Sequence, residues 1–364
     1  LTTSLSTSTG LAISPLLGMG ALGLWEYWKT APENRGELPW YTEPWVWGVC
    51  LGIFLLGNMK DTVGVVVPEM LKKPLSVLEV LEDKLSAAVV ALAVIPPTIM
   101  AHLPEEGETA LREGAEGPLL AAIPGVAFPL MLLPLAFLMF GSVWMVFHAV
   151  KCLLLLSPSS FVTAGVKFCQ GIFLVLFAGT AYFTPWLGII VSVVLAVGCL
   201  LIFGWAFRWN VYGSLFVWDF LTQTSRVPLD EGEKEFSGFL LGGQEVGVKP
   251  RSFGRLSQDG ENLQFTYKPY LLFPARTVTI PREGYRVGLR KGLIFPAITM
   301  RAEQEEEYQS FLELRVRYWS HEEAVAKGLA VDERQPSRLV QGARNAWSWF
   351  RQQLEIDLGP VREG

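Results

Sequence analysis

Nine polar side chains interrupt or border the apolar stretches in the first 220 residues, and their types suit them to chemistry. They form three groups: Asn58, Lys60 and Asp61; then Glu79, Asp83 and Lys84; then His148, Lys151 and Lys167. A charged group in hydrocarbon is costly unless it is paired or hydrated, so such residues often mark a pathway or a binding site. We predict that the nine residues form a polar membrane site that binds an ion, a proton or a lipid headgroup.

The same residues also have a structural interpretation. Each group lies near the end of an apolar stretch, where a long side chain can reach water while its stem stays in hydrocarbon. One spacing favours a shared site, because Glu79 and Asp83 are four residues apart and therefore lie on one face of a helix. Both interpretations stay open at the level of the sequence.

Signatures of catalysis and of metal binding are missing from the sequence. It has three histidines, His102, His148 and His321, and it contains no HExxH, GxSxG, Walker or dinucleotide-binding pattern. Its four cysteines are not spaced as a metal site or a redox pair, and we expect buried thiols. We therefore expect no cofactor and no bound metal, and the sequence gives no support for an enzyme.

The elements that would position these side chains are long apolar helices. The chain of 364 residues is 51% hydrophobic and 18% charged, and most of its charges follow residue 220. A helix needs about 20 mostly apolar residues to cross a bilayer. Six segments come close to this length: residues 11–28, 45–67, 75–100, 118–150, 160–183 and 186–209. We predict that residues 1–220 form an α-helical polytopic membrane bundle of about six transmembrane helices.

Aromatic and basic residues near the segment ends support this topology. Tryptophan and tyrosine prefer the headgroup region of a bilayer, so we interpret those near the segment ends as anchors. They are Trp25, Tyr27, Trp28, Trp40, Tyr41, Trp45, Trp47, Tyr182, Trp186, Trp205, Trp209 and Tyr212. Basic residues are more frequent in the loops on the side of the two termini, and cytoplasmic loops carry such an excess. Both termini are therefore expected in the cytoplasm.

Residues 221–364 have the pattern of a separate water-soluble domain. Apolar and polar residues alternate in NLQFTYKP, RTVTIP, YRVGLRKG and FLELRVRYW, as is typical of half-buried strands, and SQDGEN suits a hairpin turn. Helices are expected near residues 321–329 and over residues 337–358. We predict a small, mostly-β cytoplasmic domain, namely a pleckstrin-homology-like barrel of six or seven strands with a C-terminal amphipathic helix.

Three pieces of the first 220 residues carry a resemblance to a known family. They are STSTGLAISPLL from Ser6, LLGNMKDTVGVVVP from Leu55 and HAVKCLLLLSPSSFVTAGVKF from His148. In order and spacing they resemble the uncharacterised bacterial multi-pass inner-membrane proteins of the domain of unknown function 4126. The resemblance implies a bacterial cytoplasmic-membrane location and a compact body of six helices. It implies no activity, and it does not extend to residues 221–364.

Two functions fit these patterns. The first is translocation of a small solute, an ion or a lipid, with the polar site lining the path and the cytoplasmic domain regulating or docking. The alternative is a non-catalytic scaffold or accessory subunit of a larger membrane complex. The expected partners are the lipid bilayer and other membrane-protein subunits, and a homo-oligomer is compatible with the sequence. Nucleic acid is not expected, because the net charge is −5 and no basic face is concentrated.

Overall fold

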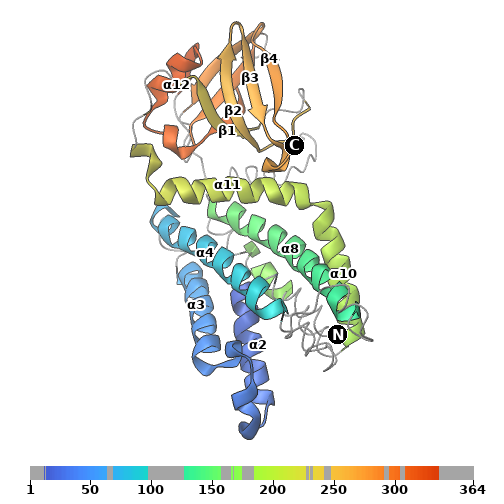
Figure 1. The fold of residues 1–364 in the computed structure, drawn as a ribbon. Helices are drawn as coiled ribbons and strands as arrows, with labels where there is room; N and C mark the ends of the chain where they lie inside the picture. Colours follow the sequence, from blue (N-terminus) through green and yellow to red (C-terminus); the bar gives the residue numbers. More distant parts are fainter. Residues whose placement is uncertain are drawn as a thin grey trace, which may run out of the picture. The chain divides into compact units, whose positions relative to one another are not determined.

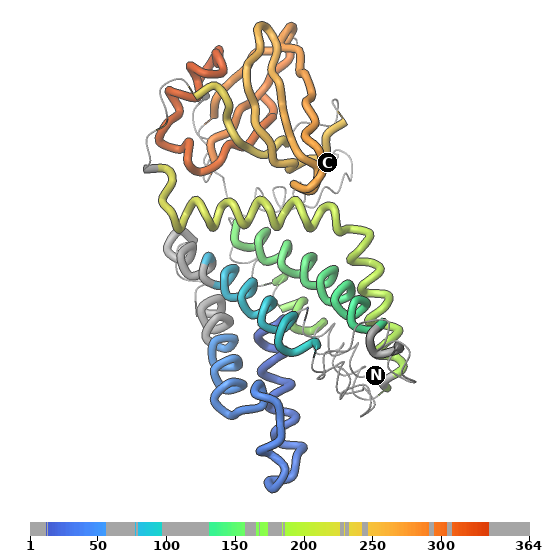
Figure 2. Tube along the Cα trace, in the orientation of Figure 1, coloured from blue at the N-terminus to red at the C-terminus, as the bar shows by residue number. Residues whose placement is uncertain are grey.

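The chain divides into two compact units, residues 1–206 and residues 207–364. The computed structural model describes residues 12, 14–63, 69–96, 127–156, 165, 166, 168–173, 184–226, 229, 233–241, 247–290, 295–303 and 308–335. Figure 1 draws their helices and strands, and Figure 2 follows the same chain as a tube, coloured from blue at the N-terminus to red at the C-terminus.

The first unit is helical. Its elements are α2 (Pro15–Lys29), the 3₁₀ turns η1 (Pro32–Glu37) and η2 (Trp40–Thr42), α3 (Pro44–Val63), α4 (Glu69–Val89), the π-helical turn η4 (Val90–Val94), α8 (Ala127–Leu156) and α10 (Pro185–Leu201). Proline begins α2, α3 and α10, where its missing N–H is not needed because the first helical N–H groups have no partner within the helix.

Helices α2 and α3 pack against each other as a hairpin, joined by η1 and η2. The hairpin depends on close backbone approach at Gly23. A Cβ atom at this position would lie 2.3 Å from the carbonyl oxygen of Tyr41 and 3.1 Å from the Cβ of Trp47. Glycine is therefore required here by lack of space.

The prediction of about six membrane spans is wrong for the residues that the structure describes. Within them, a single helix segment, Met131–Leu156 in α8, is long and apolar enough to cross a membrane. Helices α10 and α11 (Phe203–Leu221) together are long and apolar enough to cross a membrane, but the chain bends by 69° at the break between them. The apolar part of α3, Pro44–Leu55, is short, and α4 carries charged residues along its length.

The physical reason for the error is that hydropathy averages cannot detect where a helix bends or ends. Apolar composition placed helices correctly near α2, α3, α4, α8 and α10, but it did not establish their length or continuity. Most of the predicted fifth segment, residues 160–183, lies outside the described residues.

The second unit contains one mixed sheet of eight strands, in the order β4-β3-β2-β1-β7-β6-β5-β8. The strands are β1 (Glu235–Leu240), β2 (Ser252–Asp259), β3 (Asn262–Tyr267), β4 (Arg276–Pro281), β5 (Tyr285–Arg290), β6 (Ala297–Ala302), β7 (Gln309–Leu314) and β8 (Glu333–Gln335). Neighbouring strands are antiparallel except for the parallel pair β5 and β8. The small pleckstrin-homology-like barrel is therefore the wrong fold, because alternation predicts strands and not their order.

Individual elements of this unit were predicted well. The four alternating stretches contain β3, β4, β5 and β7, and the predicted turn joins β2 to β3 at Gly260, whose φ is +60°. Helix α12 (Glu322–Gly328) occupies the expected position, and Val325 and Leu329 pack into the core of the sheet. The predicted helix over residues 337–358 lies outside the described residues.

Candidate polar site between α4 and α8

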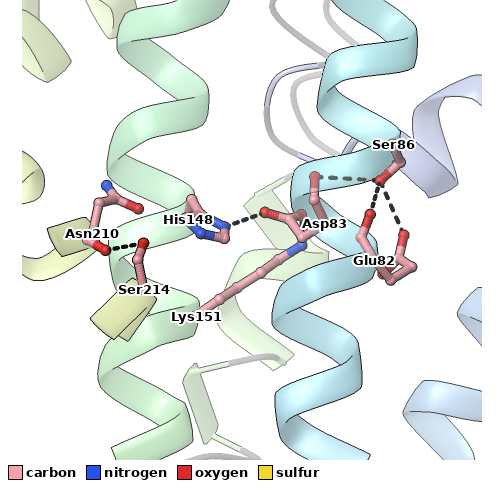
Figure 3. Close-up of polar contacts among 7 residues, drawn as sticks. All are labelled: Glu82, Asp83, Ser86, His148, Lys151, Asn210 and Ser214. Atoms are coloured by element: carbon pink, nitrogen blue, oxygen red, sulfur yellow. Dashed lines mark hydrogen bonds and ion pairs between the residues drawn. The ribbon is translucent and has the colours of Figure 1, made fainter. Parts of the chain in front are cut away.

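Three of the predicted site residues meet between α4 and α8. Asp83 on α4 faces His148 and Lys151, which lie one turn apart on α8 (Figure 3). The Nδ1 atom of His148 lies 2.5 Å from Oδ2 of Asp83, and the Nζ atom of Lys151 donates to Oδ1. The side chains of His148 and Asp83 are 0% and 2% exposed, whereas that of Lys151 is 19% exposed. The site is therefore a buried carboxylate between two nitrogen donors.

The electrostatics of the site favour an ionised Asp83. Burial alone raises the pKa of this carboxyl group, but the positive charge of Lys151 and the hydrogen bond from His148 outweigh burial and lower its pKa below the ordinary 3.8. An ionised carboxylate only accepts hydrogen bonds. The hydrogen between the two side chains therefore belongs to Nδ1 of His148.

The His148 ring has an aromatic neighbour, and its second nitrogen is in a different environment from Nδ1. The ring stacks on Trp144, one turn earlier in α8, with the centroids 5.0 Å apart and the planes inclined by 19°. The Nε2 atom is buried and has no hydrogen-bond partner among the residues that the structure describes. An imidazole held at Nδ1 can gain or lose a proton at Nε2 without leaving its place.

Glu82 lies beside this site and was not among the predicted site residues. Its carboxylate accepts a hydrogen bond from Ser86 Oγ at 3.0 Å, and the same hydroxyl lies 2.8 Å from the backbone oxygen of Glu82 (Figure 3). Burial raises the pKa of Glu82, although the charge of Lys151 acts against this shift. The four-residue spacing of Glu82 and Ser86 was the signal in the sequence that could have found this pair.

The structure does not bring all nine predicted residues together. Glu79 and Lys84 are half-buried on α4. The side chains of Asn58, Lys60 and Asp61 and the whole of Lys167 lie outside the described residues. A site larger than Asp83, His148 and Lys151 thus stays a prediction.

The donor set of the site suits a proton better than a metal ion. Within the described part of the chain, no group of three or more His, Cys, Asp or Glu side chains could hold a metal. Lys151, as an ammonium group, has no lone pair to offer a cation.

Of the cysteines, Cys50, Cys152 and Cys199 are buried as expected, whereas Cys169 is exposed, contrary to expectation.

A second buried polar cluster, within residues 207–364, was missed by the sequence analysis. Arg315, just after β7, donates from Nε to Asp219 Oδ2 on α11 at 3.0 Å, and a second hydrogen bond joins its Nη2 to Oδ1. Tyr212 of α11 donates to Glu313 Oε2 at 2.7 Å. These partners are about a hundred residues apart, so no local spacing could have indicated them.

This cluster also changes the interpretation of two aromatic residues. Trp209 and Tyr212 were expected to lie at headgroup depth, but they are 1% and 4% exposed. The guanidinium of Arg251 lies over both rings, 4.5 Å from the centroid of Trp209 and 5.8 Å from that of Tyr212. They therefore join α11 to the sheet and do not anchor a span.

No protein-family model, curated protein or solved structure matches this chain. The resemblance to the domain of unknown function 4126 therefore stays a prediction.

Proposed function

We propose that the protein is a membrane-bound translocation module for an ion, namely the proton, and that His148 carries this proton. One observation supports the proposal above the others. His148 is a buried imidazole held at Nδ1 by the ionised Asp83, and its Nε2 has no hydrogen-bond partner among the described residues. It lies on the helix segment that is long and apolar enough to cross a membrane.

The surface of the helical unit supports a membrane location. Large apolar side chains are exposed along α10, a pattern that is unfavourable in water and favourable against lipid. They are Trp186, Leu187, Ile190, Val193, Val194, Val197, Leu200 and Leu201. We further propose the cytoplasmic membrane of a bacterium, with residues 221–364 in the cytoplasm. This finer location rests on the family resemblance and on the distribution of basic residues in the loops.

Binding of one proton changes the net charge of the site. With Asp83 ionised, Lys151 charged and His148 neutral, the three side chains sum to zero charge. A proton on Nε2 of His148 gives the site a net charge of +1, and charge interactions are strong where water is excluded. His148 therefore has two protonation states, and the electrostatic energy between α4 and α8 differs in the two states. A ligand such as the proton can shift a conformational equilibrium only through an energy difference of this kind.

Proton entry into sealed proteoliposomes tests the proposal. The full chain is reconstituted with a pH-sensitive dye inside, valinomycin and potassium prevent a membrane potential, and the outside is acidified. We expect faster internal acidification than in liposomes without protein. His148→Gln should abolish the difference, because glutamine keeps hydrogen-bonding groups and cannot carry the proton.

Ser142→Ala is the matched control. Ser142 is buried on the same helix, and its hydroxyl donates to the carbonyl oxygen of Met139 within α8. The control should keep the flux of the unmodified protein. Unchanged flux in His148→Gln, with the variant still folded by size-exclusion chromatography, would contradict the proposal.

A scaffold is the second function that a specific observation favours. The buried pair Asp219 and Arg315 and the bond from Tyr212 to Glu313 fasten α11 to the eight-stranded sheet, which suits a firmly held docking surface. Extraction in a mild detergent followed by mass measurement distinguishes the two. A stable complex with other subunits and no proton flux would support the scaffold, and a lone functional monomer would exclude it.

A further inference from the structure

The loop between β3 and β4 displays an apolar tip in the second unit. Tyr270, Leu271, Leu272 and Phe273 are 44%, 46%, 87% and 55% exposed. Large apolar side chains in water are unfavourable, and four consecutive ones form a patch that needs a partner. The strands of the sheet follow the opposite pattern, because their large apolar residues are mainly buried in the core.

The backbone of this loop holds the apolar tip in place. Tyr270 and Leu271 have φ angles of +50° and +58°, a conformation that is rare for bulky residues. The turn is closed by hydrogen bonds from the N–H of Leu271 to the oxygen of Lys268 and from the N–H of Phe273 to the oxygen of Pro269. Such strain persists where the surrounding fold enforces it and is frequent at functional sites.

Basic residues border the apolar tip on both sides. Lys268 precedes it and Arg276 follows it, and both are exposed. Neither forms an ion pair with another residue in the described part of the chain. An apolar tip between two cations is complementary to the headgroup region of an anionic bilayer, where apolar groups enter the interface and cations meet lipid phosphates.

The loop also contacts helix α11 within the second unit. The ring of Tyr270 packs on that of Phe207 in α11, with their centroids 5.3 Å apart.

We propose that residues 268–276 are a membrane-insertion loop, whose tip Tyr270–Phe273 enters the interface of an anionic lipid bilayer while Lys268 and Arg276 contact lipid phosphates. The proposal requires membrane association but no proton transfer. Its test is therefore independent of the proposed transport function.

The test measures the depth of the loop in the full chain in lipid nanodiscs. Cys169 is the exposed cysteine, so Cys169→Ser provides a background for labelling, in which Leu272→Cys carries an environment-sensitive fluorophore. The nanodiscs contain phosphatidylcholine, with or without phosphatidylglycerol, and a nitroxide lipid as quencher. We expect a blue shift and strong quenching at this position when phosphatidylglycerol is present.

Glu261→Cys is the matched control. Glu261 is exposed in the turn between β2 and β3, at the opposite end of β3, about 20 Å away at the rise of an extended strand. Its label should show neither effect. Adding Lys268→Gln or Arg276→Gln to the Leu272→Cys protein should lower the ratio of inserted to withdrawn loop about fivefold for each charge removed.

Two results would overturn the proposal. Quenching of the Leu272→Cys label no stronger than that of the Glu261→Cys label would mean that the loop stays in water, which would leave a protein as its partner. Equal quenching with and without phosphatidylglycerol would refute the assignment of anionic lipid.

Discussion

Replacement of Asp83 by asparagine removes the negative charge that holds Lys151 and His148 together. Loss of one partner of a buried ion pair costs about 3–5 kcal/mol. Because the side chain of Lys151 is 19% exposed and can regain water, we expect the lower end, about 3 kcal/mol, in the free energy of unfolding. Lys151→Met should cost about 2 kcal/mol, since the imidazole N–H of His148 can still donate a hydrogen bond to the carboxylate.

A double-mutant cycle isolates the interaction between the two residues. The sum of the single changes is about 5 kcal/mol, and the double variant should lose only about 3 kcal/mol, which gives a coupling energy of about 2 kcal/mol. The assay is urea unfolding of the full chain in a mild detergent at pH 7, followed by tryptophan fluorescence. Additive single effects, within about 0.5 kcal/mol, would refute the buried network.

The pH dependence of the same cycle has a definite sign. The pKa of Asp83 is lowered in the folded protein, so its stabilising effect is complete above the ordinary value of 3.8 and is lost as the pH falls through the folded pKa. The stability difference between the unmodified protein and Asp83→Asn should therefore stay constant from pH 7 to about pH 5 and shrink only in stronger acid. A difference that disappeared near neutral pH would contradict an ionised Asp83.

Three further substitutions test contacts within each of the two units. Arg315→Met leaves the buried Asp219 without its cation and should cost about 3–5 kcal/mol in urea unfolding. Gly254→Ala places a Cβ atom 2.5 Å from the ring of Phe265, and the resulting strain should cost about 1–3 kcal/mol; near-neutral stability would mean that the ring moves aside. Gly23→Ala should open the hairpin of α2 and α3 and speed its proteolysis, and an unchanged cleavage rate would contradict the close approach.

Local features of the sequence predicted local elements of the structure. Alternation in NLQFTYKP and RTVTIP predicted strands where β3 and β4 occur, and apolar composition predicted a helix where α8 occurs. The eight-strand order was beyond this reasoning, because β1 pairs with β7 across more than seventy residues, and alternation is the same in a sheet and in a barrel.

The candidate site was predictable in part, because some of its residues stand out locally in the sequence. Asp83, His148 and Lys151 were recognised as charged residues in apolar surroundings, which is a local property. Their meeting depends on how α4 packs on α8, since Asp83 and His148 are 65 residues apart. Asp219 and Arg315 were missed because each has an ordinary sequence context, and only the fold brings them together.

The most direct test of the central claim is to follow the protonation of His148 itself. The chain has three histidines, so ¹⁵N NMR of histidine-labelled protein in lipid gives few imidazole signals, and the signal absent from His148→Gln identifies His148. We predict that this imidazole changes its protonation state over the pH range in which proton flux changes. A His148 signal that stays constant while the flux changes would contradict the account.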